Sequence, residues 1–333
     1  YDLILVDEAQ DISDVMIGIV ENQSCRRIYV GDSFQQIYTF RFATNALNKI
    51  DLPSYDLTQS FRFGDNYAKV LQNNLNSLYE INSSKPLKIS GLEKTTLIGK
   101  NHIDFSKQFC VIARSTFGLI QQLVYFIHDK KKVYFEGGYN SYSFMNQTVY
   151  SIFYLKQKKN DKITIDEIKD FDTINELEQF AKDTKNQDYL NIIKFINTYG
   201  DNIFEINKKI KEFLVNDKKD ADIIFTTTHK SKGLEYEQVI MADDFISKKE
   251  ITNTKNKLSF QRINEELNIY YVAATRTKNV IQLADLNLSY TYNENDETTS
   301  YVKSRFISKR ADNKKSKELQ EEWLKNNRAK KII

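Results

Sequence analysis

Short apolar runs bounded by polar or turn-forming residues recur along the chain. Runs of this length that are rich in Ile and Val are typical of strands buried in a sheet. They predict strands at Leu3–Val6, Ile28–Val30, Phe109–Ala113, Ile223–Phe225, Gln238–Met241 and Val280–Leu283. Between them, apolar residues return with helical spacing, as at Tyr67, Val70, Leu71, Leu75 and Leu78, and again at Ile263, Leu267, Tyr270 and Tyr271. This alternation predicts an α/β fold in which helices cover both faces of a parallel sheet.

The pattern changes between about residues 139 and 216. This stretch is rich in Lys and Asn, has mainly helical spacing and shows few strand signals, and the strand–helix alternation resumes after it. An inserted helical domain is the simplest interpretation. The length of 333 residues also indicates two or three compact units.

Composition narrows the class of protein. A hydrophobic fraction of 41% and a charged fraction of 28% are typical of folded globular domains. Cys25 and Cys110 lack the spacing of a disulfide framework or a zinc site, which favours a reducing compartment. The sequence has neither a run of about 18 apolar residues nor a signal-peptide pattern. We therefore expect an intracellular protein without a membrane segment, cytoplasmic in a prokaryote or nuclear in a eukaryote.

Positive charge is concentrated near the end of the sequence. The net charge of +3 is too small to indicate nucleic acid binding by itself. From Lys303 to Lys331, however, eleven Lys and Arg residues stand against four Asp and Glu residues. Such a tail is more often a solvated helix or arm than a contact for phosphate groups, and both interpretations stay open.

Two adjacent carboxylates follow the first predicted strand. In an open parallel sheet, ligands bind beyond the carboxyl ends of the strands, where Asp7 and Glu8 would lie. Nucleotide hydrolysis uses one carboxylate to hold Mg²⁺ and another to deprotonate the attacking water. An isolated Asp-Glu pair is more often an acidic turn before a helix, so the pair needs support from elsewhere in the chain.

That support comes from a series of ordered motifs. Together they resemble the UvrD-like superfamily 1A DNA helicases, and their wording resembles the F-box DNA helicase branch in particular, although no F-box is visible. The matching segments are Asp7–Asp11 (motif II), Gly31–Arg41 (III), Leu57–Arg62 (IV), Val111–Ser115 (IVa), Thr226–Glu235 (V) and Tyr271–Arg276 (VI). The resemblance implies an ATP-dependent helicase that moves 3′ to 5′ on single-stranded DNA, with DNA junctions among its substrates and with roles in DNA repair or recombination.

The resemblance assigns roles around ATP and Mg²⁺. Asp7 would hold the metal, Glu8 would be the general base, and Gln10 and Gln35 would sense the γ-phosphate. Arg62 and Arg276 would stabilise the charge on the transferring phosphoryl group, a task that suits the planar and permanently charged guanidinium. Glu235 would bind the ribose, and Gly233 would lie near the γ-phosphate. The alternatives are a surface ion pair for Arg62 and a charge on a helix surface for Arg276.

The resemblance also assigns contacts with the DNA strand. Tyr38 and Phe40, beside Arg41, would stack on bases, which stabilises binding without demanding a sequence. The alternative is that both aromatic residues belong to the core. Arg114, Thr227 and His229 would make further contacts with the DNA strand.

Two departures from the family pattern stand out. Phe42 replaces a small residue at the end of motif III, and no Gly-x-x-x-x-Gly-Lys-[Ser/Thr] loop occurs in the sequence. We therefore weigh two interpretations, a fragment of an active helicase and a catalytically inactive DNA-binding module or half of a split motor. A nuclease–helicase fusion is a weaker third.

We expect tandem RecA-like domains, the first incomplete, acting as a monomer. The first occupies residues 1–52, the second 53–138 and 217–291, the mainly helical insertion 139–216 and the basic tail 292–333. The Gly137–Gly138 pair resembles the turn that precedes this insertion in the family.

Overall fold

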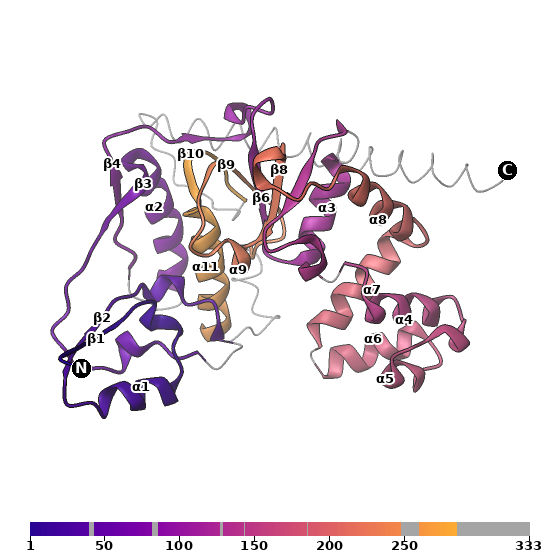
Figure 1. The fold of residues 1–333 in the computed structure, drawn as a ribbon, viewed down its shortest axis with the longest axis horizontal. Coiled ribbons are helices and arrows are strands. Elements are labelled where there is room, and N and C mark those ends of the chain that lie inside the picture. The colour runs from indigo at the N-terminus through magenta and orange to yellow at the C-terminus, as the bar shows by residue number, and fades with distance from the viewer. Residues whose placement is uncertain are drawn as a thin grey trace. The chain divides into compact units, whose positions relative to one another are not determined.

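The alternation of strands and helices expected from the sequence is present in the computed structural model of the protein (Figure 1). The structure describes residues 1–39, 43–81, 86–126, 129–142, 144–184, 186–247 and 260–284. All six strands predicted from apolar runs are present. Five lie within two residues of the expected bounds, and the last begins at Thr277, three residues earlier than expected. Six pairings between strands are parallel, as expected.

The largest sheet has six strands. In sheet order they are β5 (Leu97–Ile98), β10 (Thr277–Gln282), β9 (Tyr236–Met241), β6 (Phe109–Ala113), β8 (Ile223–Thr227) and β7 (Val133–Phe135). All residues of β6 and β8 are buried. A parallel strand covered on both faces needs apolar side chains on both sides, which is why these strands are continuous apolar runs in the sequence.

The chain divides into two compact units. Of the described residues, the first unit contains 1–105, 109–114 and 226–284, and the second contains 106–108 and 115–225. The second unit includes α3 (Thr116–Phe126), α4 (Gln147–Lys156), α5 (Asp166–Lys169), α6 (Ile174–Asp183), α7 (Gln187–Tyr199) and α8 (Asn202–Phe213). The stretch with helical spacing, residues 139–216, thus carries α4 to α8.

A two-stranded sheet opens the first unit. It pairs β1 (Leu3–Val6) with β2 (Arg26–Tyr29), and α1 (Asp14–Glu21) connects them. Val30 N donates to Val6 O at 2.8 Å, and Ala9 N donates to Val30 O at 2.9 Å. Because the strands are parallel, their carboxyl ends lie at one edge, so the residues that follow β1 meet those that follow β2.

Two helices supply much of the buried core of this unit. In α2 (Asp65–Ile81), Tyr67, Leu71, Leu75 and Leu78 are fully buried at the predicted helical spacing. In α11 (Phe260–Ala274), Leu267, Tyr270 and Tyr271 are likewise buried. Tyr67 Oη donates to Ala274 O at 2.9 Å, and Tyr79 Oη donates to Asn268 Oδ1 at 3.0 Å. No helix among these described segments is both long enough and apolar enough to cross a membrane.

Two glycines make β3 (Gln59–Gly64) and β4 (Ser90–Leu92) approach closely. A Cβ on Gly64 would lie 2.0 Å from Lys94 O, and a Cβ on Gly91 would lie 2.3 Å from the carbonyl carbon of Gly64. Both neighbours are backbone atoms that no side-chain rotation can move. β3 carries Arg62, so this packing also positions a candidate site residue.

We expect Gly64→Ala to destabilise the protein by about 1 to 3 kcal/mol, the usual cost of forcing extra volume into a packed interior. Gly18→Ala is the matched control, because Gly18 lies in α1 and nothing stands within 4 Å of a Cβ there. Removing glycine from a helix should leave stability equal or higher by about 0.5 to 1 kcal/mol. Urea unfolding followed by circular dichroism measures both, and equal midpoints for Gly64→Ala and the wild type would contradict the packing argument.

Candidate functional site

Glu8 stands in a left-handed backbone conformation directly after β1. Its φ and ψ are 51° and 41°, a region that non-glycine residues seldom occupy. Its N–H donates to Asp7 Oδ1 at 2.8 Å, and both carboxylates are exposed. Such a conformation persists only where the surroundings hold it, and it is common at functional sites. The two acids at the strand end therefore occupy a turn whose geometry is fixed by other contacts.

Gln10 and Gln35 are brought together through Asp32. Gln10 is fully buried, and its Nε2 donates to Glu8 Oε2 at 2.5 Å while its Oε1 accepts from Asp32 N at 3.0 Å. Gln35 Nε2 donates to Asp32 Oδ2 at 3.0 Å. A Cβ on Gly31 would lie 2.4 Å from Gln10 Oε1, so only glycine leaves room for this side chain. The segment after β2 is thereby linked to Glu8.

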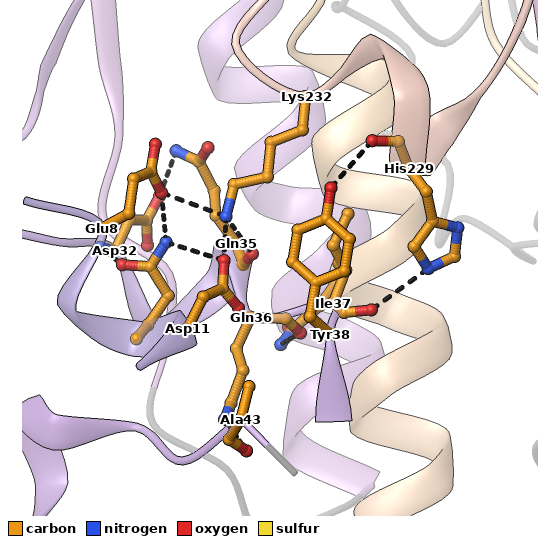
Figure 2. A network of polar contacts seen from close by, with 12 residues as sticks. Glu8, Asp11, Asp32, Gln35, Gln36, Ile37, Tyr38, Ala43, His229 and Lys232 are labelled. Carbon is orange, nitrogen blue, oxygen red and sulfur yellow. Dashed lines mark hydrogen bonds and ion pairs between the residues drawn. The ribbon is translucent and has the colours of Figure 1, made fainter. Parts of the chain in front are cut away.

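Lys232 lies among these groups and was not singled out from the sequence (Figure 2). Its Nζ is 3.0 Å from Glu8 Oε2, forms an ion pair with Asp11, and donates to Gln35 O at 3.1 Å. The Lys232 side chain is 8% exposed. Burial raises the pKa of the Asp11 carboxyl above its ordinary value, even though the hydrogen bond from Lys232 acts in the opposite direction. In the sequence, Lys232 is visible only as a lysine inside the Thr226–Glu235 segment. Its acidic partners lie far away in the sequence, so the pattern of residues does not reveal the ion pairs.

Arg62 and Glu235 form an ion pair. Arg62 Nε lies 3.2 Å from Glu235 Oε2, and its Nη1 donates to Thr275 O at 2.9 Å. Lys278 Nζ lies 2.6 Å from Glu235 Oε1. The hydrogen bond from Lys278, and then that from Arg62, lower the pKa of Glu235. Gly233, at the start of this turn, has a φ of 79° and is exposed.

Arg276 is 2% exposed and is held by neutral oxygens. It donates to Val272 O at 2.8 Å, Leu234 O at 3.2 Å and Thr275 Oγ1 at 2.8 Å. Burial, followed by repulsion from Arg62, lowers the pKa of Arg276 to about 10, whereas attraction to Glu8 acts in the opposite direction. Arg276 is thus within electrostatic reach of both Arg62 and Glu8.

The helix α11 is tied to the loop after β2. Asn268 Nδ2 donates to Ser33 O at 3.2 Å and to Gln36 O at 3.1 Å. Burial, together with the charge of Asp32 and a hydrogen bond to it, raises the pKa of Tyr271 well above its ordinary value. The segment that carries Arg276 is therefore fixed against the segment that carries Gln35.

Comparison with known proteins identifies the family of the chain. Residues 11–290 match the family model of the UvrD-like helicase C-terminal domain. The chain belongs to this family.

F-box DNA helicases are among the curated proteins that the chain resembles. It is 30% identical over 307 residues to F-box DNA helicase 1 from Gallus gallus, covering 85% of this chain and 29% of that protein. It is also 30% identical over 308 residues to F-box DNA helicase protein 1 from Schizosaccharomyces pombe, covering 86% of this chain and 34% of that protein. This UvrD-like chain thus spans about a third of the length of these relatives.

Among the residues expected to contact single-stranded DNA, Tyr38 and His229 lie together in this UvrD-like domain. Tyr38 Oη donates to His229 O at 2.9 Å, and His229 Nε2 lies 3.1 Å from Ile37 O, as Figure 2 shows. The ring centroids of Tyr38 and His229 are 5.7 Å apart. Thr227, at the end of β8, is 9% exposed. Phe40, Arg41 and Phe42 lie outside the described residues.

Arg114 occupies a different environment from Tyr38 and His229. Its Nε and Nη2 donate to the two carboxylate oxygens of Glu266 at 2.8 and 2.7 Å, and its backbone N–H donates to Asp244 Oδ1 at 2.9 Å. The hydrogen bonds to Glu266 raise the pKa of Arg114. A paired contact of this kind uses two of the five N–H donors of the guanidinium and offsets its charge. Glu266 would therefore weaken the attraction of Arg114 for a DNA phosphate.

Within the described ranges, no cluster of three or more His, Cys, Asp or Glu side chains could hold a metal ion. Mg²⁺ usually takes one or two carboxylates and completes its shell with water and phosphate oxygens. Asp7, an exposed carboxylate at the strand end, fits that smaller requirement.

Proposed function

We propose that this chain is the part of a DNA helicase motor that couples ATP hydrolysis to movement along single-stranded DNA. One observation carries the proposal: the buried Arg276 lies within electrostatic reach of both Arg62 and Glu8, and these three residues come from distant segments of the chain. The family membership and the DNA helicases among the relatives support the same reading. The 3′ to 5′ direction is part of the proposal.

The charges suit a bound triphosphate. Two guanidinium groups repel each other, and Arg276 is buried against neutral oxygens, so an anion between them would relieve an unfavourable interaction. Bound ATP and Mg²⁺ would supply the phosphoryl group and neutralise its charge. Asp7 would hold the metal, Glu8 would accept the proton of the attacking water, and Gln10 and Gln35 would sense the γ-phosphate through their shared contact with Asp32.

Glu235 is placed to act on the same ligand. Its carboxylate, now shared by Arg62 and Lys278, would accept hydrogen bonds from a ribose, and Arg62 would then leave it for the phosphates. Gly233 would allow the close approach of a phosphate, because nothing lies within 4 Å of the position a Cβ would occupy. ATP binding would thus exchange one set of ion pairs for another.

The phosphate-binding loop is the missing part. The sequence contains no Gly-x-x-x-x-Gly-Lys-[Ser/Thr]. Leu5 on β1 is 67% exposed and Val15 on α1 is 72% exposed, although parallel strands are normally covered on both faces. We propose that another segment of the natural polypeptide, carrying that loop, covers these residues.

A second candidate follows from the same missing loop. Without it, the chain would be a catalytically inactive DNA-binding module or one half of a split motor. ATPase assays on the whole natural polypeptide, with and without single-stranded DNA, separate the two. Hydrolysis stimulated by DNA supports the motor, whereas strand binding without hydrolysis supports the inactive module.

Tyr38→Ala is expected to weaken binding of single-stranded DNA by about 1 to 3 kcal/mol, the usual contribution of one stacked base. Tyr38→Phe keeps the ring and loses the hydroxyl that donates to His229 O, so it should bind nearly as well as the wild type. Tyr55→Ala, at an 89% exposed tyrosine, is the control for loss of an aromatic ring. Fluorescence anisotropy with a labelled oligonucleotide gives the affinities, and equal affinity for Tyr38→Ala and wild type would assign Tyr38 to the core.

A further inference from the structure

Lys232 contacts both the residues proposed to hydrolyse ATP, around Glu8, and the residues proposed to bind DNA, around Tyr38. Its ammonium contacts Glu8, Asp11 and the carbonyl of Gln35 on the hydrolytic side (Figure 2). The same ammonium lies 5.5 Å from the centroid of the Tyr38 ring, on the strand side, a distance typical of a cation–π contact. A change at Tyr38 therefore acts directly on a cation that holds Glu8.

The two ion pairs of Lys232 differ in environment. The Asp11 side chain is 12% exposed, whereas the Glu8 side chain is 54% exposed. Water screens the pair with Glu8 much more than the pair with Asp11, and charges interact more strongly where water is excluded. When the ammonium moves, it should therefore keep Asp11 and release Glu8.

The backbone connects Lys232 to the proposed DNA-binding residues. Lys232 follows α9 (Thr228–Ser231), which contains His229. His229 contacts Tyr38 through its carbonyl and Ile37 through its ring. A base stacking on Tyr38 would therefore act both on the cation–π contact and on the segment that ends in Lys232.

We propose that Lys232 is a positioning residue that couples strand binding to catalysis: without DNA it restrains Glu8, and strand binding at Tyr38 and His229 lets it withdraw toward Asp11. Glu8 Oε2 accepts from Gln10 Nε2 and lies 3.0 Å from Lys232 Nζ, so these contacts hold the carboxylate away from an attacking water and keep hydrolysis low until DNA is bound. This inference rests on the proposed ATPase function. It adds a residue and a direction of control to that function.

The test compares ATP turnover with and without single-stranded DNA in the whole natural polypeptide. Lys232→Met alone would leave Asp11 buried without a counter-ion, so it is combined with Asp11→Asn. We expect the turnover of Lys232→Met/Asp11→Asn without DNA to rise about tenfold, with the KM for ATP little changed, and the stimulation by DNA to fall by a similar factor, a coupling of ordinary size between two sites. Lys232→Arg should keep most of the stimulation, and Lys230→Met controls for the loss of a lysine from the same segment.

Asp11→Asn alone should act in the opposite direction. It weakens the buried anchor and leaves the ammonium more dependent on Glu8, so turnover with DNA should fall while turnover without DNA stays low. Should the double variant prove unfolded, this single variant decides, and DNA stimulation at the wild-type level in Asp11→Asn would overturn the inference. Wild-type stimulation in a folded Lys232→Met/Asp11→Asn variant would overturn it equally.

Glu8→Gln separates the two proposals. If it abolishes turnover while the Lys232 variants keep wild-type stimulation, the coupling is wrong and the motor stands. If Glu8→Gln leaves turnover intact, the proposed role of Glu8 is wrong, and the coupling through Lys232 fails with it.

Discussion

Replacing Glu8 with Gln is expected to lower DNA-stimulated ATP turnover by about 10²- to 10⁴-fold, the usual contribution of a positioned general base. Glutamine has nearly the same shape and can still hydrogen bond, but it cannot accept the proton of water. Binding of single-stranded DNA should be almost unchanged, because Tyr38 and His229 make their mutual contacts without Glu8. Phosphate release and fluorescence anisotropy on the same preparation measure both quantities.

Glu21→Gln is the matched control for Glu8→Gln. Glu21 is an exposed carboxylate in the same part of the chain, and its ion pair is with Arg27 at 3.2 Å. Turnover of Glu21→Gln should equal that of the wild type. Undiminished turnover in Glu8→Gln would remove Glu8 from the role of base and leave another group to be found.

Replacing Arg62 with Ala is expected to lower turnover by about 10³- to 10⁵-fold, the range found for arginines that stabilise the charge on a transferring phosphoryl group. The stability of the fold should change little. Arg62 is 25% exposed and its ion pair with Glu235 is partly open to water, and such pairs contribute about 0 to 1 kcal/mol. For Arg62→Ala we therefore expect a large loss of ATP turnover, measured by ATPase assay, together with a small change in unfolding temperature, measured by thermal unfolding.

Arg276 should behave differently from Arg62 in stability. It is 2% exposed and donates to Val272 O, Leu234 O and Thr275 Oγ1, so truncation leaves buried acceptors unsatisfied, at about 1 to 3 kcal/mol each. Arg276→Ala should therefore lose both turnover and stability. Arg26→Ala, at an exposed arginine on β2, should lose neither. Full turnover in Arg62→Ala would mean that its pair with Glu235 is structural.

The exchange of ion pairs that we propose would begin from groups already paired within the chain. Arg62 is held by Glu235, and Glu8 is held by Lys232 and Gln10. Glu8 and Arg62, two of the groups that the proposal assigns to hydrolysis, thus have partners of opposite charge within the chain. This arrangement limits the cost of gathering charged groups at one site, and it would make binding of the proposed nucleotide a competition with internal partners.

Much of the fold could be read from the order of residues alone. The strands β1, β6 and β8 follow from continuous apolar runs, and the face of α2 follows from the spacing of Tyr67, Leu71, Leu75 and Leu78. These patterns are local, because burial at a fixed spacing reflects the period of the element itself. The strands β3, β4 and β5 were not predicted. β3 and β4 contain polar residues and glycine, and β5 has only two residues, so none of them forms an apolar run. Their strand structure depends on pairing with neighbouring strands.

For the site, the sequence determined the chemical types and the strand-end position of Asp7 and Glu8, while only the tertiary structure decided which charges are paired. The family resemblance implied that Arg114 contacts single-stranded DNA, and in the structure its guanidinium forms an ion pair with Glu266. Lys232 drew no attention in the sequence, and the fold makes it the partner of Glu8 and Asp11. The physical reason is that an ion pair depends on distances between segments far apart in the chain, and packing of β1, β2, α9 and α11 sets those distances.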